Sequence, residues 1–196
     1  MSDPVVIAPA SSALLVMDFQ RSILDMLGND APSLLERTAA LVDAARARAM
    51  RVIYVVVGFR AGHPEASAKN ASFAAIKGSG RFAAGDVGAE IHPGVAPRGD
   101  EVVVTKHRVS GFHGTDLDIV LRANGIDTLV LAGIATSGVV LSTVRHAADN
   151  DYRLVVVEDC CADRDAEVHR VLMMKVFARQ TTVLSSADAI ARIASH

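Results

Sequence analysis

The chain has 196 residues, of which 51% are apolar, 4% aromatic and 21% charged. This length suits a single domain over residues 1–196 with an aliphatic core. The net charge is −2 with both signs scattered, so nothing in it favours a nucleic acid or an anionic membrane as partner. No apolar run approaches the roughly 18 residues of a membrane span, and no basic leader opens the sequence. Because Cys160 and Cys161 are adjacent, we expect no disulfide framework and a cytoplasmic location.

Short apolar runs alternate with amphipathic stretches along the chain. The runs predict strands at Ala13–Met17, Val52–Val57, Glu101–Thr105, Thr128–Ala132, Arg153–Val157 and Thr181–Leu184. The amphipathic stretches predict helices at Pro32–Met50, Asp116–Asn124, Val139–Asp149, Asp165–Arg179 and Ser186–Ile193. This alternation predicts an α/β fold: a three-layer α/β/α, doubly wound (Rossmann-like) sheet of about six parallel strands.

One segment departs from this alternation. Residues Gly58–Asp100 are rich in glycine and proline, with a short helix expected near Ala66–Lys77. Long ordered connections in compact domains are usually functional. We therefore expect this segment to form a wall or lid of the binding pocket.

The stretch with the most specific pattern is the turn Gly133–Gly138, between a buried strand and a helix. It holds two glycines and two hydroxyl residues, Thr136 and Ser137, either of which is expected to cap the following helix. Backbone N–H groups in such a turn favour an anion or a developing oxyanion. A nucleophile would stand at the first helical position, which is Val139 here.

Three candidate groups follow strands. Asp18 follows the first strand, Lys106 the third, and the turn Thr136–Val139 the fourth. Because ligands of doubly wound folds bind outside the carboxyl ends of the strands, we expect these groups to share one crevice. A carboxylate and an ammonium group there favour each other's charged forms, while desolvation opposes this. Such a pair can orient a water molecule or hold a proton for transfer.

Three stretches carry a resemblance to a known family: LLVMDFQ (Leu14–Gln20), VVVTKHRVSGFHGTDLD (Val102–Asp118) and the stretch from Leu129 to Asp163. With them the chain resembles the isochorismatase-like hydrolases, or cysteine hydrolases, over nearly its whole length. The resemblance implies amide hydrolysis by an Asp, Lys and Cys triad. It makes Asp18 the general base and Lys106 the lysine, followed by Ser110 and Phe112.

The chain departs from the family pattern at the nucleophile. The usual T-D-x-C-V turn reads here Thr136, Ser137, Gly138, Val139 and Val140. Valine has no lone pair and cannot form a thioester, so we do not expect cysteine-dependent amidase activity. Cys160 and Cys161 are expected to follow the fifth strand, outside this turn. These cysteines therefore do not replace the missing nucleophile.

True isochorismatases carry glycine at this position and cleave a vinyl ether without a covalent step, the aspartate protonating the substrate. The resemblance therefore implies hydrolysis of a vinyl ether or a similar small metabolite. Asp18 would be the acid or base, Lys106 its electrostatic partner, and water the nucleophile. Two alternatives remain: a catalytically inactive member that binds a small metabolite, and an amidase in which another group replaces the thiol.

Further residues are assigned from their place in these motifs. We expect Gln20, Phe112, Ala135, Thr136 and Ser137 to bind substrate, although Gln20 can instead brace a loop, Phe112 can be core and Ser137 a plain helix cap. Arg60 and Arg108 are candidates for an acidic substrate group. No metal or cofactor is expected, because His63 is the only histidine between Gly58 and Glu65 and no D-x-H pattern accompanies it. The partner is a small-molecule substrate, and relatives are commonly homo-oligomers, dimers or tetramers.

Overall fold

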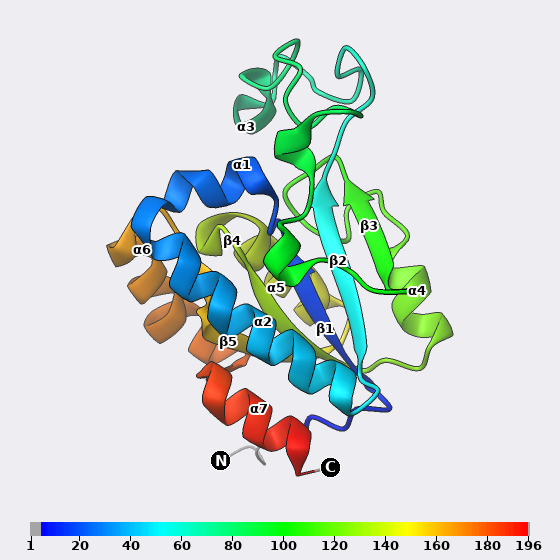
Figure 1. The fold of residues 1–196 in the computed structure, drawn as a ribbon, viewed down its shortest axis with the longest axis vertical. Coiled ribbons are helices and arrows are strands. Elements are labelled where there is room, and N and C mark those ends of the chain that lie inside the picture. Colours follow the sequence, from blue (N-terminus) through cyan, green and yellow to red (C-terminus); the bar gives the residue numbers. More distant parts are fainter. Residues whose placement is uncertain (1–4, 196) are drawn as a thin grey trace.

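Six parallel strands form the centre of the computed structural model, which describes residues 5–195 (Figure 1). They are β1 Ser12–Met17, β2 Arg51–Val57, β3 Val102–Lys106, β4 Thr128–Ile134, β5 Arg153–Ala162 and β6 Thr182–Leu184. Their order in the sheet is β3-β2-β1-β4-β5-β6, and every neighbouring pair is parallel. The predicted doubly wound sheet is confirmed. Strand order reverses between β1 and β4, which is where such folds place a ligand.

Helices cover both faces of this sheet. The α-helices are α1 Arg21–Leu24, α2 Ala31–Ala47, α3 Ala71–Ala74, α4 Leu117–Ala123, α5 Leu141–Asp149, α6 Ala166–Val171 and α7 Ser186–Ala194. Helices α2 and α7 pack together on one face, while α4 and α5 contribute to the core on the other face; Figure 1 shows α5 behind the strands and α4 beside β3. Shorter 3-10 segments are Asp25–Asp30, Val87–Ala89, Pro93–Val95 and Phe177–Arg179, and π-helical turns are Thr136–Val140 and Leu172–Val176.

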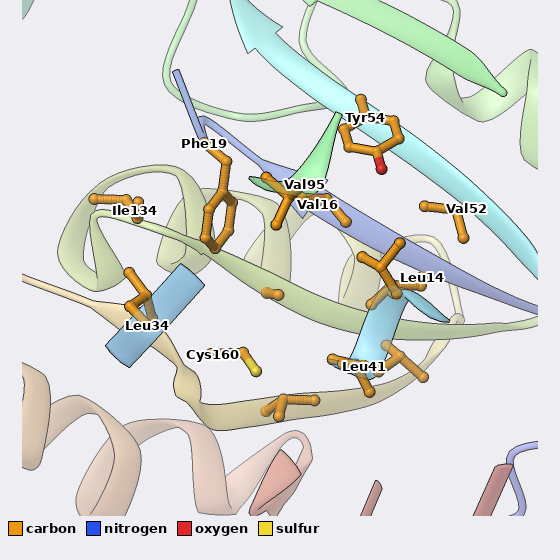
Figure 2. Packing of buried hydrophobic residues seen from close by; sticks show 14 of the residues in the cluster. Leu14, Val16, Phe19, Leu34, Leu41, Val52, Tyr54, Val95, Ile134 and Cys160 are labelled. Carbon is orange, nitrogen blue, oxygen red and sulfur yellow. The ribbon is translucent and has the colours of Figure 1, made fainter. Parts of the chain in front are cut away.

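The strands are apolar on both sides because each face supports its own core. Along β1, Leu14 and Val16 join the core beneath α2 and α7, shown in Figure 2, whereas Leu15 and Met17 join the core beneath α4 and α5. This explains the continuous aliphatic runs in the sequence, since a strand covered on both faces loses the alternation of a half-exposed strand. The rigid sheet fixes the positions of the groups at its carboxyl edge.

Three predicted boundaries are wrong. The helix expected near Ala66–Lys77 is only the single turn α3, and the helix expected at Asp165–Arg179 is broken into α6, a π-helical turn and a 3-10 turn. Strand β5 runs on to Ala162, so Cys160 and Cys161 lie within it rather than after it. A register shift between β4 and β5 accommodates the polar residues that interrupt the apolar run.

The segment between β2 and β3 rises beyond the carboxyl ends of the strands and carries α3 (Figure 1). Its position above the sheet edge is the one expected for a pocket wall. Within residues 5–195, no helix combines the length and apolar character needed to cross a membrane.

Candidate functional site

A buried ion pair lies at the carboxyl edge of the sheet. Asp18 follows β1 directly and Lys106 ends β3, on either side of the end of β2. Neighbouring strands are about 4.8 Å apart, so only long side chains reach across the intervening strand. The Lys106 Nζ lies 2.9 Å from the Asp18 Oδ2. The predicted meeting of these two groups is therefore present in the structure.

Burial sets the electrostatics of this pair. The Asp18 and Lys106 side chains are 8% and 3% exposed. Removal of the carboxylate from water raises the pKa of Asp18, and the adjacent Lys106 ammonium opposes this effect only in part. An aspartate with a raised pKa holds a proton more readily than one in water, which suits it to acid–base chemistry.

The second carboxylate oxygen of Asp18 has no hydrogen-bond partner among residues 5–195. Its Oδ1 is buried without a hydrogen bond, although Oδ2 is bound to Lys106. An unpaired buried carboxylate oxygen costs free energy, so its occurrence beside a cavity favours a ligand or water as its partner. The pair therefore presents one free acceptor that a substrate proton or a water can use.

The turn after β4 forms another side of the site, with Val139 buried at 2% exposure and lining the same cavity as Asp18 and Lys106. The predicted helix capping is wrong. Neither the π-helical turn Thr136–Val140 nor α5 has a side-chain cap, because the Thr136 hydroxyl is bound to His169 Nδ1 at 2.8 Å. The peptide bond between Ile134 and Ala135 is cis.

Several N–H groups of this turn are already engaged. The Ser137 N–H donates to the Asp163 carboxylate at 2.7 Å. The N–H groups of Gly138 and Val140 both donate to the Ala135 carbonyl, at 3.0 and 3.3 Å. The donors that the sequence suggested for an oxyanion are thus largely used to hold the turn itself.

A cavity of about 380 Å³ opens over these groups. This is within the range of small-metabolite sites, roughly 300–1,000 Å³. Its walls are mainly apolar and come from the α1 region, the β2–β3 segment, the ends of the strands and the loops after β3, β4 and β5. The apolar lining residues are Ile23, Met26, Leu27, Val57, Phe73, Ile76, Phe82, Val109, Ile134, Ala135 and Val139. The expected contribution of the β2–β3 segment to the pocket wall is confirmed.

Of the five residues expected to bind substrate, Ala135 lines this cavity and the other four do not. Gln20 is 1% exposed, and its amide bonds both the N–H and the carbonyl of Val57 at 2.9 Å, so it braces the end of β2. Phe112 stacks on His146 at 4.9 Å within the core beneath α4 and α5. Thr136 is wholly buried, and Ser137 is exposed on the outside of the turn.

The two cysteines cannot supply a nucleophile. Cys160 and Cys161 are both buried, in the cores on opposite faces of the sheet. Burial raises the pKa of Cys160 to about 12 and raises that of Cys161 as well. Both are therefore protonated at neutral pH, and neither lines the cavity that holds Asp18.

Two arginines that sequence reasoning missed line the cavity, Arg81 and Arg164. The arginines considered from the sequence do not. The guanidinium of Arg60 pairs with Glu65, and the Arg108 Nη1 donates to the backbone carbonyls of Glu65 and His107. No local pattern marked Arg81 or Arg164, because only the fold brings their loops to one opening.

His63 has a structural place in the loop that carries Arg81. It is wholly buried, its Nδ1 accepts from the Gly78 N–H at 3.3 Å and its Nε2 donates to the Arg81 carbonyl at 2.8 Å. With these partners the Nε2 is the donor of the ring and the Nδ1 its acceptor. Among residues 5–195 no cluster of three or more His, Cys, Asp and Glu side chains could hold a metal ion.

Comparison with known proteins identifies the family. Residues 12–188 match the isochorismatase domain. The chain therefore belongs to the isochorismatase family. The match spans all six strands of the sheet, from β1 to the start of α7, and includes the residues that line the cavity. The family assignment makes the protein an isochorismatase-family hydrolase.

Individual relatives agree with this assignment. An uncharacterized isochorismatase family protein of Escherichia coli, YecD, is 32% identical over 181 residues, which cover 89% of this chain and 92% of the relative. The ureidoacrylate amidohydrolase RutB of Acinetobacter baylyi is 32% identical over 89% of this chain and 80% of its own length. The crystal structure of a cysteine hydrolase from Pseudomonas syringae pv. phaseolicola superposes with a TM-score of 0.90 at 28% identity, covering 100% of this chain and 99% of that chain.

Proposed function

We propose that this isochorismatase-family protein hydrolyses a small metabolite, a vinyl ether or a similar compound, without a covalent intermediate. The observation that carries this proposal is the state of the Asp18 carboxylate. One of its oxygens is paired with Lys106, and the other is buried beside the cavity without a hydrogen-bond partner among the described residues. Val139 lies where the family resemblance places the cysteine. A hydrocarbon side chain there leaves water as the nucleophile.

The chemistry can be written for a vinyl ether. Asp18, whose pKa burial raises, donates a proton to the terminal carbon of the C=C bond, and an oxocarbenium ion results. Water adds to that cation, and the hemiketal formed breaks at the C–O bond to give an alcohol and a ketone. The proton released by water returns to Asp18. Lys106 stabilises the carboxylate while the proton is away.

The test is turnover of a panel that contains isochorismate, simple vinyl ethers, small esters and small amides. We expect hydrolysis of a vinyl ether that D18N loses and that prior treatment with iodoacetamide leaves intact, since both cysteines are buried. An activity that iodoacetamide abolishes would contradict the proposal, as would equal rates for wild type and D18N.

Val139 also favours a second function, because a family member that has lost its nucleophile can be a catalytically inactive binding protein. In that case the cavity binds a metabolite and releases it unchanged. Thermal stabilisation by a compound that the protein never turns over would support this function. The two functions differ in one result, since only the hydrolase consumes its ligand and does so through Asp18.

A further inference from the structure

The turn after β4 divides its residues between the cavity and the outside. Three of them line the cavity of the candidate site: Ala135, Gly138 and Val139. The two between them do not, since Thr136 is wholly buried away from the cavity lining and Ser137 is exposed. The contacts of Thr136 and Ser137 therefore bear on where the three cavity residues lie.

Two side chains from beyond β5 hold this turn. Asp163 follows β5 directly, and its carboxylate accepts from the Ser137 N–H at 2.7 Å. His169 belongs to α6, and its Nδ1 is hydrogen-bonded to the Thr136 hydroxyl at 2.8 Å. Because Thr136 and Ser137 are consecutive, the two contacts fix adjacent residues of the turn. Asp163 and His169 are called the α6 clamp below.

The two members of the α6 clamp are joined to each other. The other carboxylate oxygen of Asp163 accepts from the Asp165 N–H at 3.4 Å. Asp165 caps α6, and its carbonyl accepts from the His169 N–H at 3.0 Å. Burial lowers the pKa of His169, so its ring is neutral at neutral pH. The clamp is thus one hydrogen-bonded unit rather than two separate contacts.

The turn depends on this unit because it has no side-chain cap of its own. The family pattern has an aspartate where this chain has Ser137, and the carboxylate that meets the turn here comes from Asp163 instead. Within the turn, the N–H groups of Gly138 and Val140 share one acceptor, the Ala135 carbonyl. Bonds within the turn set its shape, whereas bonds to α6 set its position over the sheet edge.

We propose that Asp163 and His169 are positioning residues that set where Val139 lies in the cavity that also holds Asp18. Loss of either contact should loosen the turn locally, because the sheet beneath it is held by its own cores on both faces. The inference rests on the proposed function only in taking this cavity as the reacting site. The position of the turn can be measured without any turnover.

The thiol of V139C reports the position of the turn through its rate of alkylation by iodoacetamide. Val139 is only 2% exposed, so access should limit that rate. We expect T136V, H169L and D163A, each added to V139C, to raise the rate about three- to tenfold, the effect of one lost hydrogen bond. Since Thr136 and His169 act through one bond, T136V and H169L together should raise it no more than either alone. H169N and D163N keep a polar group for each bond and should stay within about twofold of V139C.

The mass of the intact protein separates local loosening from unfolding. Local loosening adds one carbamidomethyl group, at the new thiol, whereas unfolding also exposes the buried Cys160 and Cys161. The matched control is H113L, which replaces an exposed histidine outside the cavity lining and should leave the rate unchanged.

Four results would overturn the α6 clamp as a positioning device. They are unchanged rates in T136V, H169L and D163A, additive effects of T136V and H169L, failure of H169N and D163N to preserve the rate, and alkylation of the native cysteines together with the new thiol. The two proposals can fail separately. Absence of vinyl ether turnover by wild type would contradict the hydrolase function and leave the alkylation rates as evidence on the clamp.

Discussion

Replacement of Lys106 by methionine removes a buried ammonium group and keeps most of the side-chain volume. Asp18 is then left with no cationic partner at 6% exposure. Breaking a buried ion pair by removing one member typically costs about 3–5 kcal/mol, because the remaining charge is uncompensated. The pKa of Asp18 should rise further, since burial already raises it and Lys106 is the main opposing influence.

This loss of stability should depend on pH with a definite sign. An aspartate whose pKa is higher in the folded than in the unfolded chain favours folding only while it is protonated. Stability therefore falls as pH rises from the unfolded pKa of about 3.9 toward the folded pKa, by up to about 1.4 kcal/mol per pH unit. We expect K106M to be nearly as stable as wild type in mild acid, to lose stability on the way to neutral pH, and then to level off.

Urea unfolding at a series of pH values measures this effect, with K175M as the control. Lys175 is exposed and belongs to no ion pair among residues 5–195, so its loss should change the free energy of unfolding by less than about 0.5 kcal/mol. The D18N/K106M double variant should be more stable than K106M at neutral pH, because no buried charge remains. A loss in K106M that is equal at all pH values would refute the reasoning.

Three further predictions concern single side chains. V139C should place a thiol in the cavity, where iodoacetamide alkylates it, whereas neither native cysteine lines that cavity, and thiol-dependent amidase activity in this variant would show an otherwise intact amidase site. H63A should lower the free energy of unfolding by about 2–4 kcal/mol, because a wholly buried ring and its two hydrogen bonds are lost; equal urea midpoints for variant and wild type would contradict this. Q20A should cost about 2–3 kcal/mol, because the N–H of Val57 and the carbonyls of Val57 and Ala89 lose their partner, and unchanged thermal unfolding would refute that role.

The strands were predictable because their sequences reflect a simple physical condition. Runs such as VIYVVV in β2 are apolar on both faces, and only a covered sheet accommodates them. The meeting of Asp18 with Lys106 followed from the same reasoning, since parallel strands bring their carboxyl ends to one edge.

Other features depended on partners far away in the sequence. The extension of β5 past its polar residues was missed because the carboxylate of Asp159 binds the N–H and hydroxyl of Ser186, at 2.7 Å each. No residue near Asp159 in the sequence indicates that Ser186 is its partner. Likewise, Thr136 has the chemistry of a helix cap, but its hydroxyl is bound to His169 from α6. Such tertiary contacts cannot be predicted from the helix-capping or strand propensity of the local sequence.

The residues that line the pocket wall were equally hard to predict from the local sequence. The β2–β3 segment was recognisable as a long connection and a candidate pocket wall, yet its composition did not indicate that Arg81 would line the cavity or that His63 would bind the backbone carbonyl of Arg81. Arg164 was equally inconspicuous, because it stands in a loop among other charged residues. Both arginines line the cavity because two loops converge over the sheet edge.

The central claim is that Asp18 donates the proton in a hydrolysis that uses no thiol. Its most direct test measures vinyl ether turnover by wild type and by D18N and follows the mass of the intact protein during the reaction by mass spectrometry. We expect turnover by wild type with no mass added to the protein, and a rate at least about a hundredfold lower in D18N, the usual contribution of a general acid. A covalent adduct on the turn Thr136–Val140, or equal rates for the two proteins, would contradict it.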